Sequence, residues 1–145
     1  MIEIRISQDG APLTAEGPHS SEGARIIAAG IGEAVRLLNH ATWGGAHLAS
    51  PAAVYSIYGS LADAARRLPQ ALTQMEQHIA DAVADGTVRE DPDYGSHGGH
   101  AQAAAAETTE LTRQACAAAG ELSRLLDRLQ SAVGGLARVD PGPDR

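Results

Sequence analysis

The residues with the clearest capacity for chemistry lie in one polar, glycine-rich loop at 90–100. It holds imidazole nitrogens and carboxylate oxygens, which zinc and nickel accept as ligands, on His97, His100, Asp91 and Asp93. A site there would hold a metal ion or a small ligand. The competing interpretation is a solvated loop whose histidines bind nothing, because two flexible glycines separate the histidines and no third ligand follows at metal spacing.

The same region is acidic, with five acids and one arginine from Asp81 to Asp93. Acidic side chains on a mobile loop are suited to docking a basic protein partner, because complementary charge favours encounter. On this interpretation Asp91 and Asp93 contact the partner directly.

Aromatic side chains are concentrated where the first predicted helix gives way to the second. Trp43, Tyr55 and Tyr58 fall within sixteen residues, and Tyr94 is the only other aromatic residue of the chain. Two interpretations compete for the three. They plug the end of a helical bundle, or they form a partly exposed anchor for a protein partner, since tryptophan and tyrosine dominate binding hot spots.

Known catalytic motifs are missing from the sequence. A phosphate-binding loop needs a lysine, and the chain has none. Neither Gly-X-Ser-X-Gly nor His-Glu-X-X-His occurs. Cys116 lies in a run of alanines on a predicted helix, so we expect a buried structural thiol rather than a nucleophile. We therefore expect no enzymatic activity and no cofactor.

Composition narrows the class of partner and the compartment. The chain has 145 residues and a formal net charge of −7, so it lacks the basic footprint of a nucleic-acid binder. No stretch approaches the roughly 18 apolar residues of a membrane span, and the first residues lack the pattern of a signal peptide. We expect a cytoplasmic protein with no nucleic-acid partner and no membrane span.

Local patterns place one strand and one helix in the first forty residues. Isoleucines at positions 2, 4 and 6 alternate with polar residues, which predicts a strand at 1–7 closed by Asp9-Gly10. Three arrangements are open: the segment 11–15 returns beside the strand, the strand pairs across a dimer, or it frays on the helical body. After a loop, a serine is positioned to cap a helix at about 21–40.

Two longer helices are predicted, at about 51–84 and 101–137. Ser50-Pro51 is a strong start signal for the first of them, which Pro69 should kink or split. Both carry apolar seams spaced by threes and fours: Val54, Tyr58, Leu61, Ala65, Leu68, Leu72, Met75, Ile79 and Ala82, then Leu111, Ala115, Ala118, Leu122, Leu125, Leu129, Val133 and Leu136. The tail at 138–145 is expected to be disordered.

These elements predict an all-α fold. We expect a three-helix bundle dominated by a long antiparallel helical hairpin, with a short N-terminal strand and one domain at 1–137. The two seams would face each other in the hairpin, and the shorter helix would lie against it. The seams could equally pair between chains, so a homo-oligomer is also open.

Trp43-Gly44-Gly45, between two predicted helices, resembles the Trp-X-Gly turn of the WXG100 family. The resemblance covers about residues 23–82 and implies a small helical hairpin exported by type VII secretion. The chain departs from that pattern by an added helix and strand and by a five-residue loop between Gly45 and Pro51. It also lacks the Tyr-X-X-X-Asp/Glu export signal of the family.

A broader resemblance rests on the segments 38–42, 50–61 and 67–74. They are similar to segments of small uncharacterised helical proteins of actinobacteria, some of which are encoded near conjugative or phage-derived elements. This resemblance covers about residues 30–136. It implies a bacterial source and a helical fold, and it brings no activity or site residues.

The sequence as a whole predicts a non-enzymatic helical protein that acts in protein–protein interaction or as an accessory subunit. The identity of its protein partner is open. Two alternatives remain: an exported WXG100-like secretion factor, and a metal- or small-ligand-binding protein that uses His97 and His100.

Overall fold

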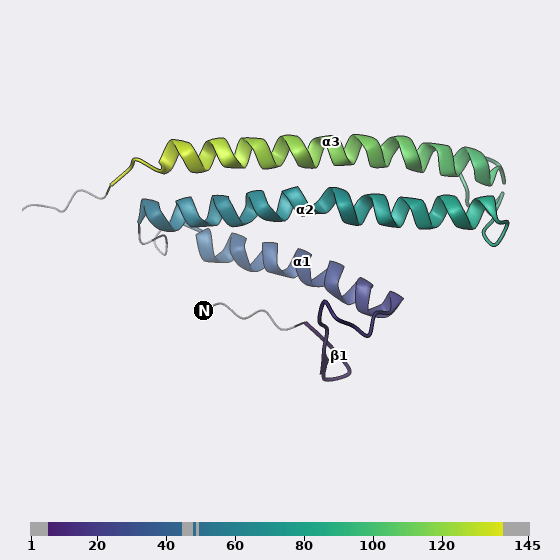
Figure 1. The fold of residues 1–145 in the computed structure, drawn as a ribbon, viewed down its shortest axis with the longest axis horizontal. Helices are drawn as coiled ribbons and strands as arrows, with labels where there is room; N and C mark the ends of the chain where they lie inside the picture. Colours follow the sequence, from purple (N-terminus) through teal and green to yellow (C-terminus); the bar gives the residue numbers. More distant parts are fainter. Residues whose placement is uncertain (1–5, 45–47, 49, 138–145) are drawn as a thin grey trace, which may run out of the picture. The chain divides into compact units, whose positions relative to one another are not determined.

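The computed structural model describes residues 6–44, residue 48 and residues 50–137. Contacts divide the chain into two compact units, 1–49 and 50–145, and each is described by itself (Figure 1). Helices α1, α2 and α3 account for most of the described residues, which confirms the all-α class. The single domain at 1–137 stays a prediction, and the tail at 138–145 lies outside the described residues.

A β hairpin opens the first unit. Strands β1 (Ser7–Gln8) and β2 (Ala11–Pro12) pair antiparallel, with Ser7 opposite Pro12. Asp9 and Gly10 both have positive φ, 51° and 80°, as a two-residue hairpin turn requires. Of the three arrangements open for the strand, the returning segment is confirmed.

The predicted strand boundaries were wrong at the C-terminal end. Strand β1 begins at Ser7 and includes Gln8, whereas the expected strand ended at Ser7. The turn at Asp9-Gly10 explains the difference, because it places Gln8 directly opposite Ala11. The isoleucines at positions 2 and 4 lie outside the described residues.

Helix α1 (Ser21–Thr42) completes the first unit. The Ser20 hydroxyl accepts a hydrogen bond of 2.9 Å from the Gly23 N–H, which caps the helix as predicted. The helix continues two residues beyond the predicted end at 40. It stops where Trp43 adopts an extended backbone conformation and Gly44 has a φ of 72°.

The second unit is a long helical hairpin. Helices α2 (Pro51–Ala84) and α3 (Ala101–Val133) lie side by side and antiparallel (Figure 1). Ser50 caps α2, and Pro51 occupies its first turn. Helix α2 runs unbroken through Pro69, so the predicted split does not occur. Helix α3 ends at Val133 rather than at 137, because two consecutive glycines follow.

Small side chains form the contact between α2 and α3. Ala62 and Ala65 pack with Leu126 in the hydrophobic core, and the half-buried Tyr58 and Leu61 flank them. The buried Ser123 hydroxyl donates to the Ala62 carbonyl oxygen at 3.2 Å. No large side chain among the described residues is fully buried. The hairpin therefore depends on close approach of two backbones rather than on a thick core.

The predicted seams were right for part of the first helix and wrong for most of the second. In the first seam Ala65 is buried, and Tyr58 and Leu61 pack against the core. Seven large members of the two seams are instead between 40% and 59% exposed: Leu68, Met75, Ile79, Leu111, Leu122, Leu125 and Leu129. Leu126, which the second seam omitted, is buried instead. Half-buried members of the seams include Leu72 and Val133. The small residues of the contact explain this, because beside Ala62 and Ala65 there is room for few bulky side chains such as Leu126.

Seven of the exposed large side chains share one side of the hairpin. At 100° per residue, the stripe on each helix lies about 80° from the contact line, in the same rotational sense on both helices. Because the helices are antiparallel, both stripes face the same way. We call this surface the apolar flank, formed by Leu68, Met75, Ile79, Leu111, Leu122, Leu125 and Leu129.

The opposite side of the hairpin is polar. An Arg66 guanidinium nitrogen lies 3.2 Å from the Asp127 carboxylate across the two helices. The Thr73 hydroxyl lies 3.9 Å from the Cys116 sulfur. These cross-helix contacts lie on the other side of the contact line from the apolar flank, so the hairpin is amphipathic across its width.

The close contact predicts how the hairpin responds to a larger side chain. Ala62→Leu should lower the free energy of unfolding by about 1–3 kcal/mol, because the added atoms force the helices apart. Ala64→Leu adds the same atoms at an exposed position of α2 and should change it by less than about 0.5 kcal/mol. Urea unfolding of the full chain measures both. Equal effects would mean that α2 and α3 do not meet at Ala62.

Candidate functional site

The loop between α2 and α3 is organised around the carboxylate of Glu90. This side chain is 10% exposed. It accepts hydrogen bonds from the backbone N–H groups of His97, at 3.1 Å, and Gly99, at 2.8 Å. Gly95 makes room for it, since a Cβ there would lie 2.2 Å from Glu90 carbon atoms. The loop thus has a defined conformation with a nearly buried acid at its centre.

His97 links this acid to helix α3. Its Nδ1 lies 3.0 Å from a Glu90 carboxylate oxygen, and its Nε2 lies 3.0 Å from a carboxylate oxygen of Glu107. The imidazole is 22% exposed, and Glu107 lies in the second turn of α3. Both ring nitrogens are therefore occupied by contacts within the protein.

The pKa of the Glu90 carboxyl is lowered from its ordinary value. Partial burial works to raise that pKa, but the hydrogen bonds from the His97 side chain and from two backbone N–H groups together outweigh it. A lowered pKa means that the ionised carboxylate stabilises the folded loop. This contribution is present above the ordinary pKa of a glutamate and is lost as the pH falls through the lowered value.

The residues predicted to bind metal are not gathered into a set of three ligands. The Asp91 carboxylate accepts from the Asp93 backbone N–H at 2.9 Å, and His100 precedes α3, with its carbonyl oxygen accepting from Ala103. Across the described parts of the chain, no three His, Cys, Asp or Glu side chains are placed to hold a metal ion. Asp91 and Asp93 remain exposed at the surface of the loop.

Sequence reasoning missed the two glutamates that hold His97. Glu90 sits seven residues before the histidine and Glu107 ten residues after it, on a separate helix. No local spacing indicates this grouping. The glycines at 95, 98 and 99 were the available signal, because a tight loop that turns back on itself requires them.

The three aromatic side chains have different environments. Tyr58 is half-buried and packs on the Ala62, Ala65 and Leu126 cluster, so it belongs to the interior of the hairpin. Tyr55 is 43% exposed, and its carbonyl oxygen accepts from the Gln130 amide at 3.2 Å. Trp43 is 79% exposed and belongs to the other compact unit.

Cys116 is a free, half-buried thiol on α3. Its sulfur lies 3.7 Å from the carbonyl oxygen of Pro69. The thiol contributes a contact between the two helices, and it is half-buried rather than buried as predicted.

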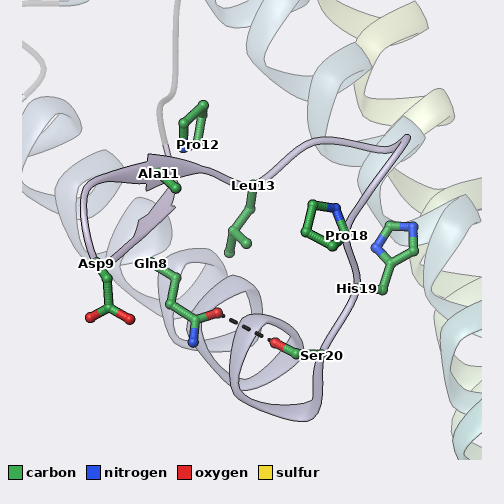
Figure 2. A pocket seen from close by; sticks show the side chains of 8 residues that line it. All are labelled: Gln8, Asp9, Ala11, Pro12, Leu13, Pro18, His19 and Ser20. Carbon is green, nitrogen blue, oxygen red and sulfur yellow. Dashed lines mark hydrogen bonds between the residues drawn. The ribbon is translucent and has the colours of Figure 1, made fainter.

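An open pocket lies in the first unit, between the β hairpin and the start of α1 (Figure 2). Leu13 and Pro18 give it an apolar wall, and the Ser20 hydroxyl donates to the Gln8 side-chain oxygen at 3.3 Å beside it. Two of the polar side chains that line this pocket, Gln8 and Ser20, thus bond to each other. Ser20 also caps α1, which accounts for its position without a ligand.

No family model matches this chain, and no curated protein or solved structure is significantly similar to it. None of the helices in the described ranges is both long enough and apolar enough to cross a membrane.

The role of Gly95 predicts that even a small side chain disrupts the loop. Gly95→Ala should displace the Glu90 carboxylate and lower the hydrogen-exchange protection of the Gly99 amide by roughly three- to tenfold, the factor that one lost hydrogen bond contributes. Gly120→Ala is the control, because a Cβ there meets open space. Exchange measured by NMR at constant pH compares the variants. Unchanged protection in Gly95→Ala would show that Glu90 does not hold the loop.

Proposed function

We propose that this protein is a non-enzymatic helical protein that acts by associating with other protein chains through the apolar flank of its hairpin, copies of itself among them. The observation that carries the proposal is the exposure of seven large apolar side chains on one side of two antiparallel helices. Large apolar side chains gathered on one face are typical of interaction sites, whereas scattered single residues need no explanation.

The shape of the flank favours a helical partner segment. The exposed apolar side chains form two rows, one on α2 and one on α3. A third helix packs onto such a pair by inserting its own side chains between the rows. Burying apolar area on both partners is the main favourable term in such an association. The proposed contact is therefore a helix–helix contact, and its partner carries an apolar face of its own.

The side chains considered for metal binding or catalysis contact other groups within the protein. Both ring nitrogens of His97 contact carboxylates, Cys116 contacts the Pro69 carbonyl, and Asp91 stabilises a turn of its own loop. These contacts support a non-enzymatic role. Asp91 and Asp93 stay part of the proposal as acidic contacts for a basic partner. The expected cytoplasmic location likewise stays a prediction.

The proposal is tested by the mass of the full chain in solution. Light scattering on a sizing column should give a mass above the 14.9 kDa of one chain. Leu122→Gln combined with Leu129→Gln should lower the mass to that of one chain, because each change places an amide in the apolar contact.

Two exposed α3 positions outside the flank provide the matched control. Ala117→Gln combined with Arg128→Gln adds the same side chain twice and should leave the mass of the assembly unchanged. A wild-type chain that stays monomeric at high concentration, and whose leucine variant only unfolds more easily, would mean that the flank is covered within one chain. That result would contradict the proposal.

A further inference from the structure

We propose that His97 is a pH-dependent clasp that fastens the loop between α2 and α3 to helix α3. The two ring nitrogens each lie 3.0 Å from a carboxylate oxygen, Nδ1 from Glu90 and Nε2 from Glu107. Only the imidazolium form carries a proton on both nitrogens, so only that form donates to both acids. A neutral ring donates to one of them. This device goes beyond association through the apolar flank and does not depend on it.

The two carboxylates differ in how firmly the protein holds them. Glu90 is 10% exposed and also accepts from the backbone N–H groups of His97 and Gly99. Glu107 is 54% exposed and projects from the surface of α3. Glu90 is thus fixed inside the loop, whereas Glu107 can turn into water. On loss of a proton, the ring keeps its Nδ1–H toward Glu90, and the bare Nε2 then repels the Glu107 carboxylate.

The loss of that contact releases the loop from α3. With Glu107 turned to solvent, the link from the loop to the second turn of α3 is broken, and the hydrogen bonds to Glu90 open more often because they alone then hold the loop. The Gly99 N–H lies between the ring and the helix in sequence and donates to Glu90 at 2.8 Å. Its hydrogen bond therefore reports on how often the loop opens.

Other polar groups around the clasp have partners of their own. The Ser96 hydroxyl lies 3.3 Å from His97 Nδ1 and carries no charge. Charged side chains at the end of α2 and the start of α3 form separate hydrogen bonds: Asp81 with Gln77, Asp85 with Thr87, and Glu110 with Arg113. Glu90 and Glu107 are the acids that contact the ring, so their contacts determine the response of the clasp to pH.

Hydrogen exchange tests the clasp in the full-length protein. NMR gives protection factors for the His97 and Gly99 amides at pH 5 and pH 8. A protection factor is the intrinsic exchange rate divided by the observed rate, so the direct effect of pH on exchange cancels. Protection should be roughly two- to fivefold lower at pH 8, the factor that an exposed ion pair contributes. Amides in the middle of α3 should keep the same protection at both pH values.

Glu107→Gln separates the clasp from a general effect of pH. A carboxamide accepts from an imidazolium N–H and also donates to a neutral ring nitrogen, so it bridges to His97 in both forms. In this variant the ratio of protection between pH 5 and pH 8 should approach one. Glu110→Gln, three residues further along α3, is the matched control and should keep the wild-type ratio. A wild-type ratio of one, or an unchanged ratio in Glu107→Gln, would overturn the proposal.

Discussion

The close approach of α2 to α3 depends on the size of the side chains between them. Ala62 and Ala65 meet the opposite helix with methyl groups, and Ser123 reaches the backbone of α2 with its hydroxyl. Contacts of this kind are favourable only when backbones come close, because dispersion falls off steeply with distance. Most of the larger apolar side chains then lie beside the contact line, although Leu126 is buried on it. The two-sided character of the hairpin follows from this arrangement.

The two sides of the hairpin contribute differently to the molecule. On the polar side, Arg66 and Asp127 form an ion pair across the helices, but both side chains are about half exposed and water weakens their attraction. Such contacts favour one alignment of the helices more than they add to stability. On the other side, the apolar flank leaves much hydrophobic surface in contact with water. Burial of that surface against a partner would release the larger free energy, which is why association is the function proposed.

The connection between the helices is more ordered than its composition indicates. A nearly buried carboxylate accepts hydrogen bonds from the loop backbone, and Gly95, Gly98 and Gly99 permit the tight path around it. The charge of Glu90 is offset by these donors and by the His97 ring. The His97 ring thus couples the conformation of the loop to the second turn of α3, through Glu107. The arrangement also explains why the histidine belongs to a structural contact rather than to a metal site.

Local signals in the sequence were sufficient for the elements and for much of the chain topology. Serine caps at 20 and 50, Pro51 and the Asp9-Gly10 pair act on neighbouring backbone groups, so the end of the first strand near Asp9-Gly10, both helix starts and the bounds of α2 could be predicted, whereas the pairing of the strand stayed open. Two long helices joined by a loop of moderate length also indicated an antiparallel hairpin. The end of α3 was less certain, since leucine and alanine at 136–137 continue a helical pattern past two glycines.

Tertiary structure alone decided which line of each helix forms the contact. Apolar residues spaced by threes and fours mark a stripe, but a rotation of about 80° about the helix axis selects another line of residues without changing any local preference. The lines that carry small side chains form the contact because they let the two backbones pack closely. This condition depends on both helices at once. The grouping of Glu90, His97 and Glu107 has the same cause. The sequence by itself determined the helices, their caps and the turn, because these depend on neighbours along the chain; the contact line and the clasp required residues brought together from separate elements.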